Sequence, residues 1–226
     1  MNEFANVFRN LDWSVLADIL LAVIPALICI TLHEMSHGYV AYLMGDDTAK
    51  RAGRLTLNPI RHIDPWGLVM MTIFHFGWAK AVPVNMYRFK HPKRGMAITA
   101  LAGPVSNVII AAVFLFIYGL LYRSLYSAGA MSRAILEMVY TTSYLSLTLA
   151  IFNFLPISPL DGSKVLFSFL SDSAYARLMR YERYGMILLM VLLVSGRFSG
   201  VLSGVTGWAY DKMFVIAEYA FDLVNH

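Results

Sequence analysis

Residues 15–37 read Val15-Leu-Ala-Asp-Ile-Leu-Leu-Ala-Val-Ile-Pro-Ala-Leu-Ile-Cys-Ile-Thr-Leu-His33-Glu-Met-Ser-His37, so a long apolar run leads directly into two histidines and a glutamate. A helix needs about 20 mostly apolar residues to cross a bilayer. We therefore expect a membrane-spanning helix from about Asp12 to Met44, with Gly45 as its C-terminal cap.

The composition of the rest of the chain agrees with a membrane protein. Of its 226 residues, 58% are hydrophobic and 14% charged, and the mean hydropathy is +0.61. Soluble domains carry about 25% charged residues. The sequence predicts an all-α polytopic membrane protein with about four transmembrane helices, in a single domain (1–226) with a core at about 12–170 and a C-terminal helix and tail at 183–226. Besides 19–32, the runs free of Asp, Glu, Lys and Arg are 65–79, 95–122, 138–160 and, apart from Arg197, 184–210.

The connection from Asp46 to Arg94 differs from these runs because it is polar, basic and interrupted by glycine and proline. Its apolar part, Trp66 to Trp78, is too short for a spanning helix. We expect a re-entrant or membrane-associated β segment near residues 53–85.

The basic residues are distributed unevenly between the connections. With three spans between them, 13 of the 18 Lys and Arg residues lie on one face of the membrane, in 46–94 and 164–183. By the positive-inside rule this face is cytoplasmic, which predicts that a site formed beside these connections faces the cytoplasm and that the N-terminus lies outside. Because membrane orientation explains the basic residues, we expect no nucleic-acid partner. The single cysteine, Cys29, excludes an intrachain disulfide.

The segment His33-Glu34-Met35-Ser36-His37 has the His-Glu-x-x-His spacing of helical zinc sites. Residues four apart lie on one face of a helix, about 6 Å apart, so both imidazoles can bind one ion. Glu34 lies one position further on, where it can accept a proton from a zinc-bound water and deliver it to a leaving amine. Chance would produce this pattern about 0.003 times in a chain with this composition.

A catalytic zinc needs a third protein ligand. Asp161 is the natural candidate because Pro156 and Pro159 forbid a regular helix before it, and the unwound chain can turn its carboxylate towards the first helix. The alternative is that Asp161 only caps the following helix. Asp18 is a weaker candidate because it lies roughly 22 Å from His33 along the same helix.

These motifs resemble the site-2 protease family of intramembrane zinc metalloproteases. His33-Glu34-x-x-His37 resembles the family's metal and base signature, and Asn153-Phe-Leu-Pro-Ile-Ser-Pro-Leu-Asp161-Gly162 its second signature. Leu101-Ala-Gly-Pro-Val-Ser-Asn107 is similar to its central-helix motif. The tracts 53–59 and 77–85 resemble the compact bacterial and archaeal branch, without a PDZ or CBS domain.

The resemblance implies a fold, a cofactor and a set of residue roles. His33, His37 and Asp161 would bind one Zn²⁺ per chain, and Glu34 would be the general base. Asn153, or instead Asn107, would position the substrate backbone or stabilise the oxyanion; either amide could also make only an interhelical hydrogen bond. The implied substrate is a transmembrane protein or peptide, in a prokaryotic plasma membrane.

Two other functions stay open at this stage. One is a catalytically silent zinc-binding membrane scaffold, although a scaffold needs no base such as Glu34. The other is a transporter, against which the small number of spans and the lack of an inverted repeat argue. For a protease, an extended edge near Trp66 to Asn85 could accept an unwound substrate strand by β-augmentation. The sequence does not indicate an oligomeric state.

Overall fold

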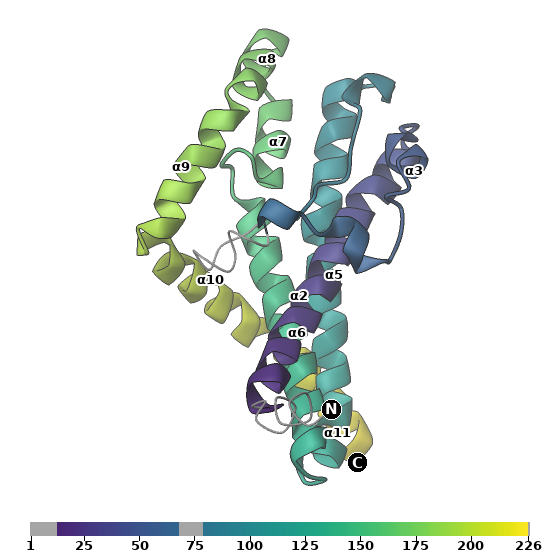
Figure 1. The fold of residues 1–226 in the computed structure, drawn as a ribbon, viewed down its shortest axis with the longest axis vertical. Coiled ribbons are helices and arrows are strands. Elements are labelled where there is room, and N and C mark those ends of the chain that lie inside the picture. The colour runs from purple at the N-terminus through teal and green to yellow at the C-terminus, as the bar shows by residue number, and fades with distance from the viewer. Residues whose placement is uncertain (1–12, 68–78, 226) are drawn as a thin grey trace, which may run out of the picture.

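Three long helices form the body of the molecule in a computed structural model that describes residues 13–67 and 79–225 (Figure 1). They are α2 (Trp13–Leu43), α5 (Pro92–Tyr126) and α6 (Ala130–Phe154), and each of them contacts the other two. Within the described residues these three are long and apolar enough to cross a membrane. The prediction of an all-helical membrane protein is confirmed in this respect.

The three helices pack closely because small residues lie between them. Cys29, Ala111 and Ala150 are fully buried. Ser143 and Ser146 of α6 donate hydrogen bonds of 3.0 and 2.8 Å to backbone carbonyls of α5. In a bilayer such contacts replace the hydrophobic effect as the force that holds helices together.

The predicted end of the first helix agrees with the structure. α2 ends at Leu43, and Gly45 follows with φ of +101°, a conformation that glycine adopts without strain. The Gly45 N–H donates to the Tyr42 carbonyl at 3.1 Å.

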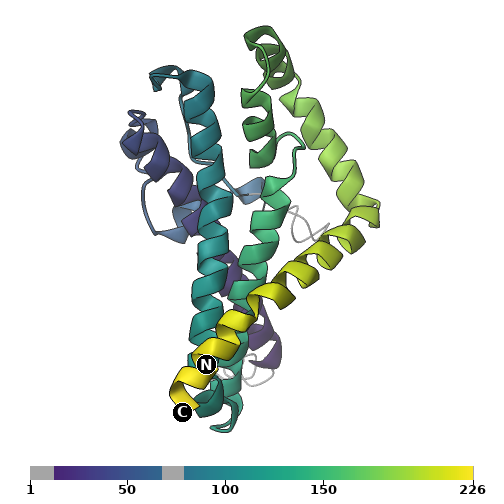
Figure 2. The same ribbon diagram turned by 180° about the vertical axis from the view of Figure 1, so that it is seen from behind.

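The C-terminal part folds as a chain of shorter helices. α9 meets α10 at a bend of 81°, where Gly196 has φ of +70°, so these helices form one broken span at most and the described chain has three or four spans. Figure 2 shows α10 running back to α11, which contacts α5. The helices are α7 (Asp161–Ser168), α8 (Asp172–Arg180), α9 (Glu182–Val194), α10 (Arg197–Met213) and α11 (Val215–Asn225).

The predicted β segment near residues 53–85 is not supported. The described residues contain no strand; this connection has only an isolated bridge between Ile63 and Ala79. The Asn58 and Asn85 side chains accept hydrogen bonds from backbone N–H groups two residues on, which favours tight turns over a ladder. Residues 68–78, most of the expected re-entrant segment, lie outside the described residues. The short helices here are α3 (Thr48–Arg51), η1 (Pro59–His62) and η2 (Met86–Arg88).

Candidate metal centre

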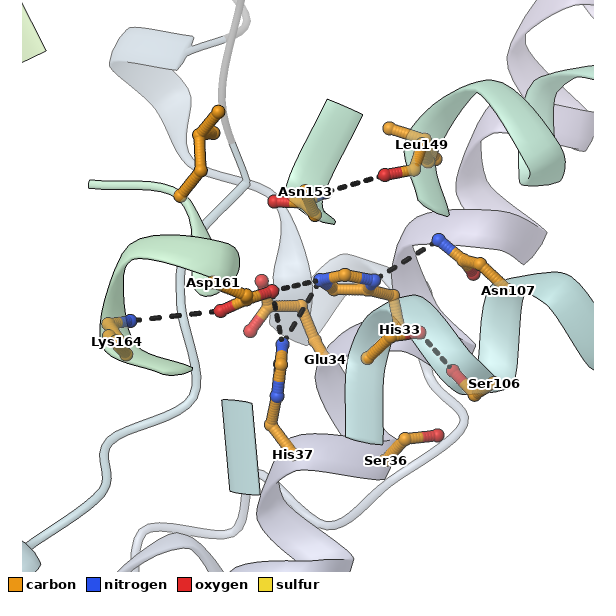
Figure 3. Close-up of polar contacts among 12 residues, drawn as sticks. His33, Glu34, Ser36, His37, Ser106, Asn107, Leu149, Asn153, Asp161 and Lys164 are labelled. Carbon is orange, nitrogen blue, oxygen red and sulfur yellow. Dashed lines mark hydrogen bonds and ion pairs between the residues drawn. The ribbon is translucent and has the colours of Figure 1, made fainter. Parts of the chain in front are cut away.

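Two helices that are distant in sequence bring three metal-binding side chains together. His33 and His37 lie one turn apart on α2, and Asp161 is the first residue of α7. The two Nε2 atoms are 3.0 Å apart, and Asp161 Oδ2 lies 3.2 Å from His33 Nε2 and 3.1 Å from His37 Nε2 (Figure 3). Within the described residues this is the one group of three or more His, Cys, Asp or Glu found that could hold a metal ion.

Asp161 reaches this position because α6 stops before it. α6 ends at Phe154, and residues 155–160, which include Pro156 and Pro159, are not helical. The expected unwound segment is therefore present. Leu160 occupies the N-cap position, so Asp161 does not serve as the N-cap of α7. A Cβ on Gly162 would lie 2.2 Å from the Phe154 carbonyl oxygen, so only glycine lets α7 begin this close to α6.

The hydrogen bond behind His37 determines which of its nitrogens can bind a metal. His37 Nδ1 lies 2.7 Å from the Thr99 backbone carbonyl on α5, and a carbonyl can only accept. Nδ1 therefore carries the proton and Nε2 presents a lone pair to the centre. On the other side of the pair, His33 Nδ1 lies 3.1 Å from Asn107 Nδ2.

The geometry fits a zinc ion. Two ligands that are 2.0–2.1 Å from a tetrahedral ion lie about 3.3 Å apart, close to the 3.0–3.2 Å separations of the three atoms. Two imidazoles and a carboxylate form an N₂O set that zinc accepts, with one position left open. The three residues are only 7–9% exposed, and a cation between them would offset the repulsion of such closely spaced acceptors.

The groups around Asp161 favour the ionised form of its carboxyl group. Burial alone would raise the pKa of its carboxyl group, but His37, His33 and Lys164 lower the pKa below its ordinary value. The Lys164 ammonium lies 3.8 Å from Asp161 Oδ1, the oxygen that faces away from the histidines (Figure 3).

Glu34 lies on the wall of a cavity of about 380 Å³ beside this cluster. Its Oε2 accepts a hydrogen bond of 2.8 Å from the backbone N–H of Val82. Asn153 and Lys164 line the same cavity. The Asn153 Nδ2 donates to the Leu149 carbonyl at 3.0 Å, which holds this amide on the wall.

The segment from Lys80 to Asn85 is fastened at both ends by buried groups. Arg54, which is 7% exposed, donates to the Lys80 carbonyl at 2.5 Å, and the Lys80 N–H donates to the His62 carbonyl at 2.9 Å. At the other end, fully buried Asp46 accepts the Asn85 N–H at 2.6 Å. The Val82 N–H is thereby held against Glu34.

Asp46 remains charged in this position. Burial would raise the pKa of its carboxyl group, but hydrogen bonds from Thr48 and the Asn85 N–H, together with the Arg88 charge, lower it below its ordinary value. The segment is thus anchored by two buried charges of opposite sign, Asp46 and Arg54.

Most of the predicted site residues meet at this cavity. His33, Glu34, His37, Asp161 and Asn153 all line it, whereas fully buried Asn107 lies behind His33. Sequence reasoning assigned no role to Thr99, Gly103 or Arg54, although Gly103 lies within the motif Leu101–Asn107. The sequence does contain a pattern that groups Thr99 and Gly103 with Asn107. The three residues are spaced four apart and so lie on one face of a helix.

Comparisons with known proteins agree with this geometry. Residues 122–196, which include Asn153 and Asp161, match a family described as "Peptidase family M50". A Bacillus subtilis (strain 168) protein named "Putative zinc metalloprotease YwhC" is 40% identical over 181 residues, or 80% of this chain and 83% of that protein. The chain belongs to peptidase family M50.

M50 is the site-2 protease family, so the resemblance stated from the sequence is confirmed. "Putative zinc metalloprotease Rip2" of Mycobacterium tuberculosis (strain ATCC 25618 / H37Rv) is 29% identical over 191 residues, 82% of this chain and 71% of that protein. "Zinc metalloprotease MJ0392" of Methanocaldococcus jannaschii is 27% identical over 193 residues, 84% and 45% respectively. No solved structure matches the chain significantly. M50 membership and these names support a zinc metalloprotease.

The first prediction concerns Gly103 of α5. A Cβ here would lie 2.4 Å from His37 Nε2 and 2.6 Å from His33 Cε1. We expect Gly103→Ala to displace the imidazoles and to remove most of the bound metal, measured as zinc per chain in detergent-purified protein. Gly204→Ala is the matched control because a Cβ there meets nothing within 4 Å. Equal zinc content in the two variants would contradict the geometry.

The second prediction concerns the anchor of the 80–85 segment. Arg54→Met keeps much of the side-chain volume but removes the hydrogen bond to Lys80, so we expect at least a several-fold loss of peptide hydrolysis with zinc content unchanged. Arg51→Met is the control, because Arg51 lies on the exposed side of α3. Undiminished hydrolysis by Arg54→Met would show that the segment needs no anchor.

Proposed function

We propose that this protein is an intramembrane zinc metalloendopeptidase that hydrolyses peptide bonds in or near the transmembrane segments of membrane-anchored proteins. The observation that carries the proposal is the convergence of His33, His37 and Asp161 on one point, with Glu34 on the adjoining cavity wall. His33 lies ten residues before the end of α2, about 15 Å along the helix axis. The centre is therefore well inside a helix of spanning length.

Three residues hold one zinc per chain in this proposal: His33 and His37 through Nε2, and Asp161 through Oδ2. Their lone pairs already point to one another at 3.0–3.2 Å. The bound ion supplies a Lewis acid that polarises the scissile carbonyl and lowers the pKa of the attacking water.

Glu34 moves the proton. Its carboxylate takes a proton from water as the water oxygen bonds to the scissile carbonyl carbon, and it passes that proton to the leaving nitrogen as the carbon–nitrogen bond breaks. One peptide bond and one water thus give one carboxylic acid and one amine. The Val82 N–H keeps Glu34 Oε2 at the cavity wall. Asn153 is the candidate to orient the substrate backbone or to stabilise the oxyanion from the same wall.

The substrate strand lies along residues 80–85 in this proposal. The N–H groups of Lys80 and Val82 are used by His62 and Glu34. Exposed Ala81 lies between them, and within the described residues neither its N–H nor its C=O has a hydrogen-bond partner. In this proposal these two groups pair with a β-augmented substrate.

We further propose that the centre faces the cytoplasmic side of a prokaryotic plasma membrane. The Lys- and Arg-rich connections 46–94 and 164–183 lie on one side of the three spans, and the loop between α5 and α6 lies on the other. The positive-inside rule makes the first side cytoplasmic.

The third prediction tests this orientation by thiol labelling in intact cells. Native Cys29 is fully buried and gives little background. We expect a membrane-impermeant maleimide to label Ser127→Cys, in the loop between α5 and α6, while Arg61→Cys reacts only after permeabilisation. Both positions are exposed, so accessibility depends on the side of the membrane. The reverse labelling pattern would place the active site on the opposite side.

The fourth prediction separates a protease from a silent scaffold. Purified wild-type protein should contain about one zinc per chain, which should be lost in the His33→Ala/His37→Ala double variant and weakened in Asp161→Ala. Glu34→Gln should retain zinc but cleave a transmembrane substrate at least a hundredfold more slowly, since general acid–base catalysis contributes 10²–10⁴-fold.

One control variant and two possible outcomes decide how this experiment is interpreted. Glu218→Gln changes a carboxylate on α11 and should leave both zinc content and cleavage unchanged. If Glu34→Gln cleaves as fast as the wild type, Glu34 is not the base. If the zinc-loaded wild type cleaves none of a panel of transmembrane substrates, the zinc-binding scaffold becomes the better description.

A further inference from the structure

One face of α5 forms the back wall of the histidine pair. Thr99, Gly103 and Asn107 lie on it at intervals of four residues. The Thr99 carbonyl fixes His37, and Gly103 provides the space for both imidazoles. Asn107, at 0% exposure, places its side-chain amide 3.1 Å from His33 Nδ1 (Figure 3).

The ring nitrogen of His33 that carries the proton determines whether the Asn107 amide must donate or accept a hydrogen bond. An imidazole that binds a metal through Nε2 carries its proton on Nδ1, and this N–H needs an acceptor. The Asn107 nitrogen faces His33, while the amide oxygen is buried without a hydrogen-bond partner in the described part of the chain. Turning the amide over by 180° exchanges these two atoms and moves no others, which puts an acceptor opposite Nδ1.

We propose that Asn107 is a positioning residue for the metal centre, whose amide oxygen accepts the Nδ1 proton of His33 and so keeps the His33 Nε2 lone pair directed at the zinc. This inference rests on the zinc site of the proposed function. Asn107 then acts on His33 as the Thr99 carbonyl acts on His37, and α5 sets the tautomer of both ligands. Asn107 touches neither the cavity nor the metal-binding atoms.

The backbone of Asn107 is held separately from its side chain. The hydroxyl of Ser146 on α6 donates to the Asn107 carbonyl at 2.8 Å. A change confined to the Asn107 side chain therefore leaves this interhelical hydrogen bond in place. The contribution of the amide to zinc binding can be measured apart from the packing of α5 against α6.

The fifth prediction compares two substitutions of nearly the same shape. Asn107→Leu removes the acceptor, and Asn107→Asp keeps an acceptor but has no amide donor. We expect zinc to bind about 10–100-fold more weakly to Asn107→Leu, the usual effect of losing an outer hydrogen bond to a ligand, and Asn107→Asp to bind at least as tightly as the wild type. Zinc affinity is measured by competition with a chromogenic chelator, without any substrate.

The pattern of affinities decides the proposal. If Asn107→Asp binds zinc as weakly as Asn107→Leu, the amide acts as a donor or only fills space, and the proposal is wrong. Equal affinity of Asn107→Leu and the wild type also overturns it. If a buried carboxylate prevents Asn107→Asp from folding, Asn107→Gln and Asn107→Met give the same comparison without charge, and Gln should bind zinc more tightly than Met.

Two controls distinguish loss of the hydrogen bond to His33 from general damage to helix packing. Ser146→Ala removes the hydrogen bond to the Asn107 backbone, and thermal unfolding of each zinc-free variant reports damage to packing. A loss of zinc affinity in Asn107→Leu that only matches the loss in Ser146→Ala would assign Asn107 a structural role. Absence of zinc from the wild-type protein would instead contradict the proposed function, whatever the variants do.

Discussion

Three lone pairs directed at one buried point are the constraint on which the rest of this structure depends. His33 Nε2, His37 Nε2 and Asp161 Oδ2 lie 3.0–3.2 Å apart. Acceptors at such distances repel one another in a medium of low polarity unless a cation lies between them. The chain nevertheless brings them together from α2 and α7, which argues that the helices are arranged to bind a metal ion.

The zinc-binding sequence motif was predictable because its geometry is local. His33 and His37 share a helix, so their spacing alone fixes the distance between the imidazoles. The proline pair before Asp161 carries a second local signal, since proline excludes a regular helix whatever the tertiary context. The membrane helices were predictable for a similar reason. The thickness of the bilayer sets the length of apolar sequence that a spanning helix needs, whatever other segments the helix packs against.

The features that sequence reasoning missed depend on contacts between distant residues. Nothing near Arg54 reveals that its guanidinium will hold the Lys80 carbonyl, and a β segment was expected where short turns and an isolated bridge occur. Asn107 was expected to position the substrate backbone or stabilise the oxyanion in place of Asn153, or to make only an interhelical hydrogen bond. A polar residue that contacts substrate and one that lies behind a histidine give the same sequence pattern. The C-terminal bend at Gly196 likewise divides a run that composition alone left ambiguous.

Each of the three proposed metal ligands is held from its far side, the two histidines by α5 and Asp161 by its own helix α7. Asn107 stands behind His33, the Thr99 carbonyl behind His37, and Lys164 beside the outer oxygen of Asp161. The position of the proposed ion would therefore be set by α5 and α7 as much as by α2. Glu34 differs, because its hydrogen bond comes from the Val82 backbone in a non-helical segment. The proposed ligands are thus fixed by packed helices, while Glu34, the proposed base, contacts the segment that is the candidate to receive substrate.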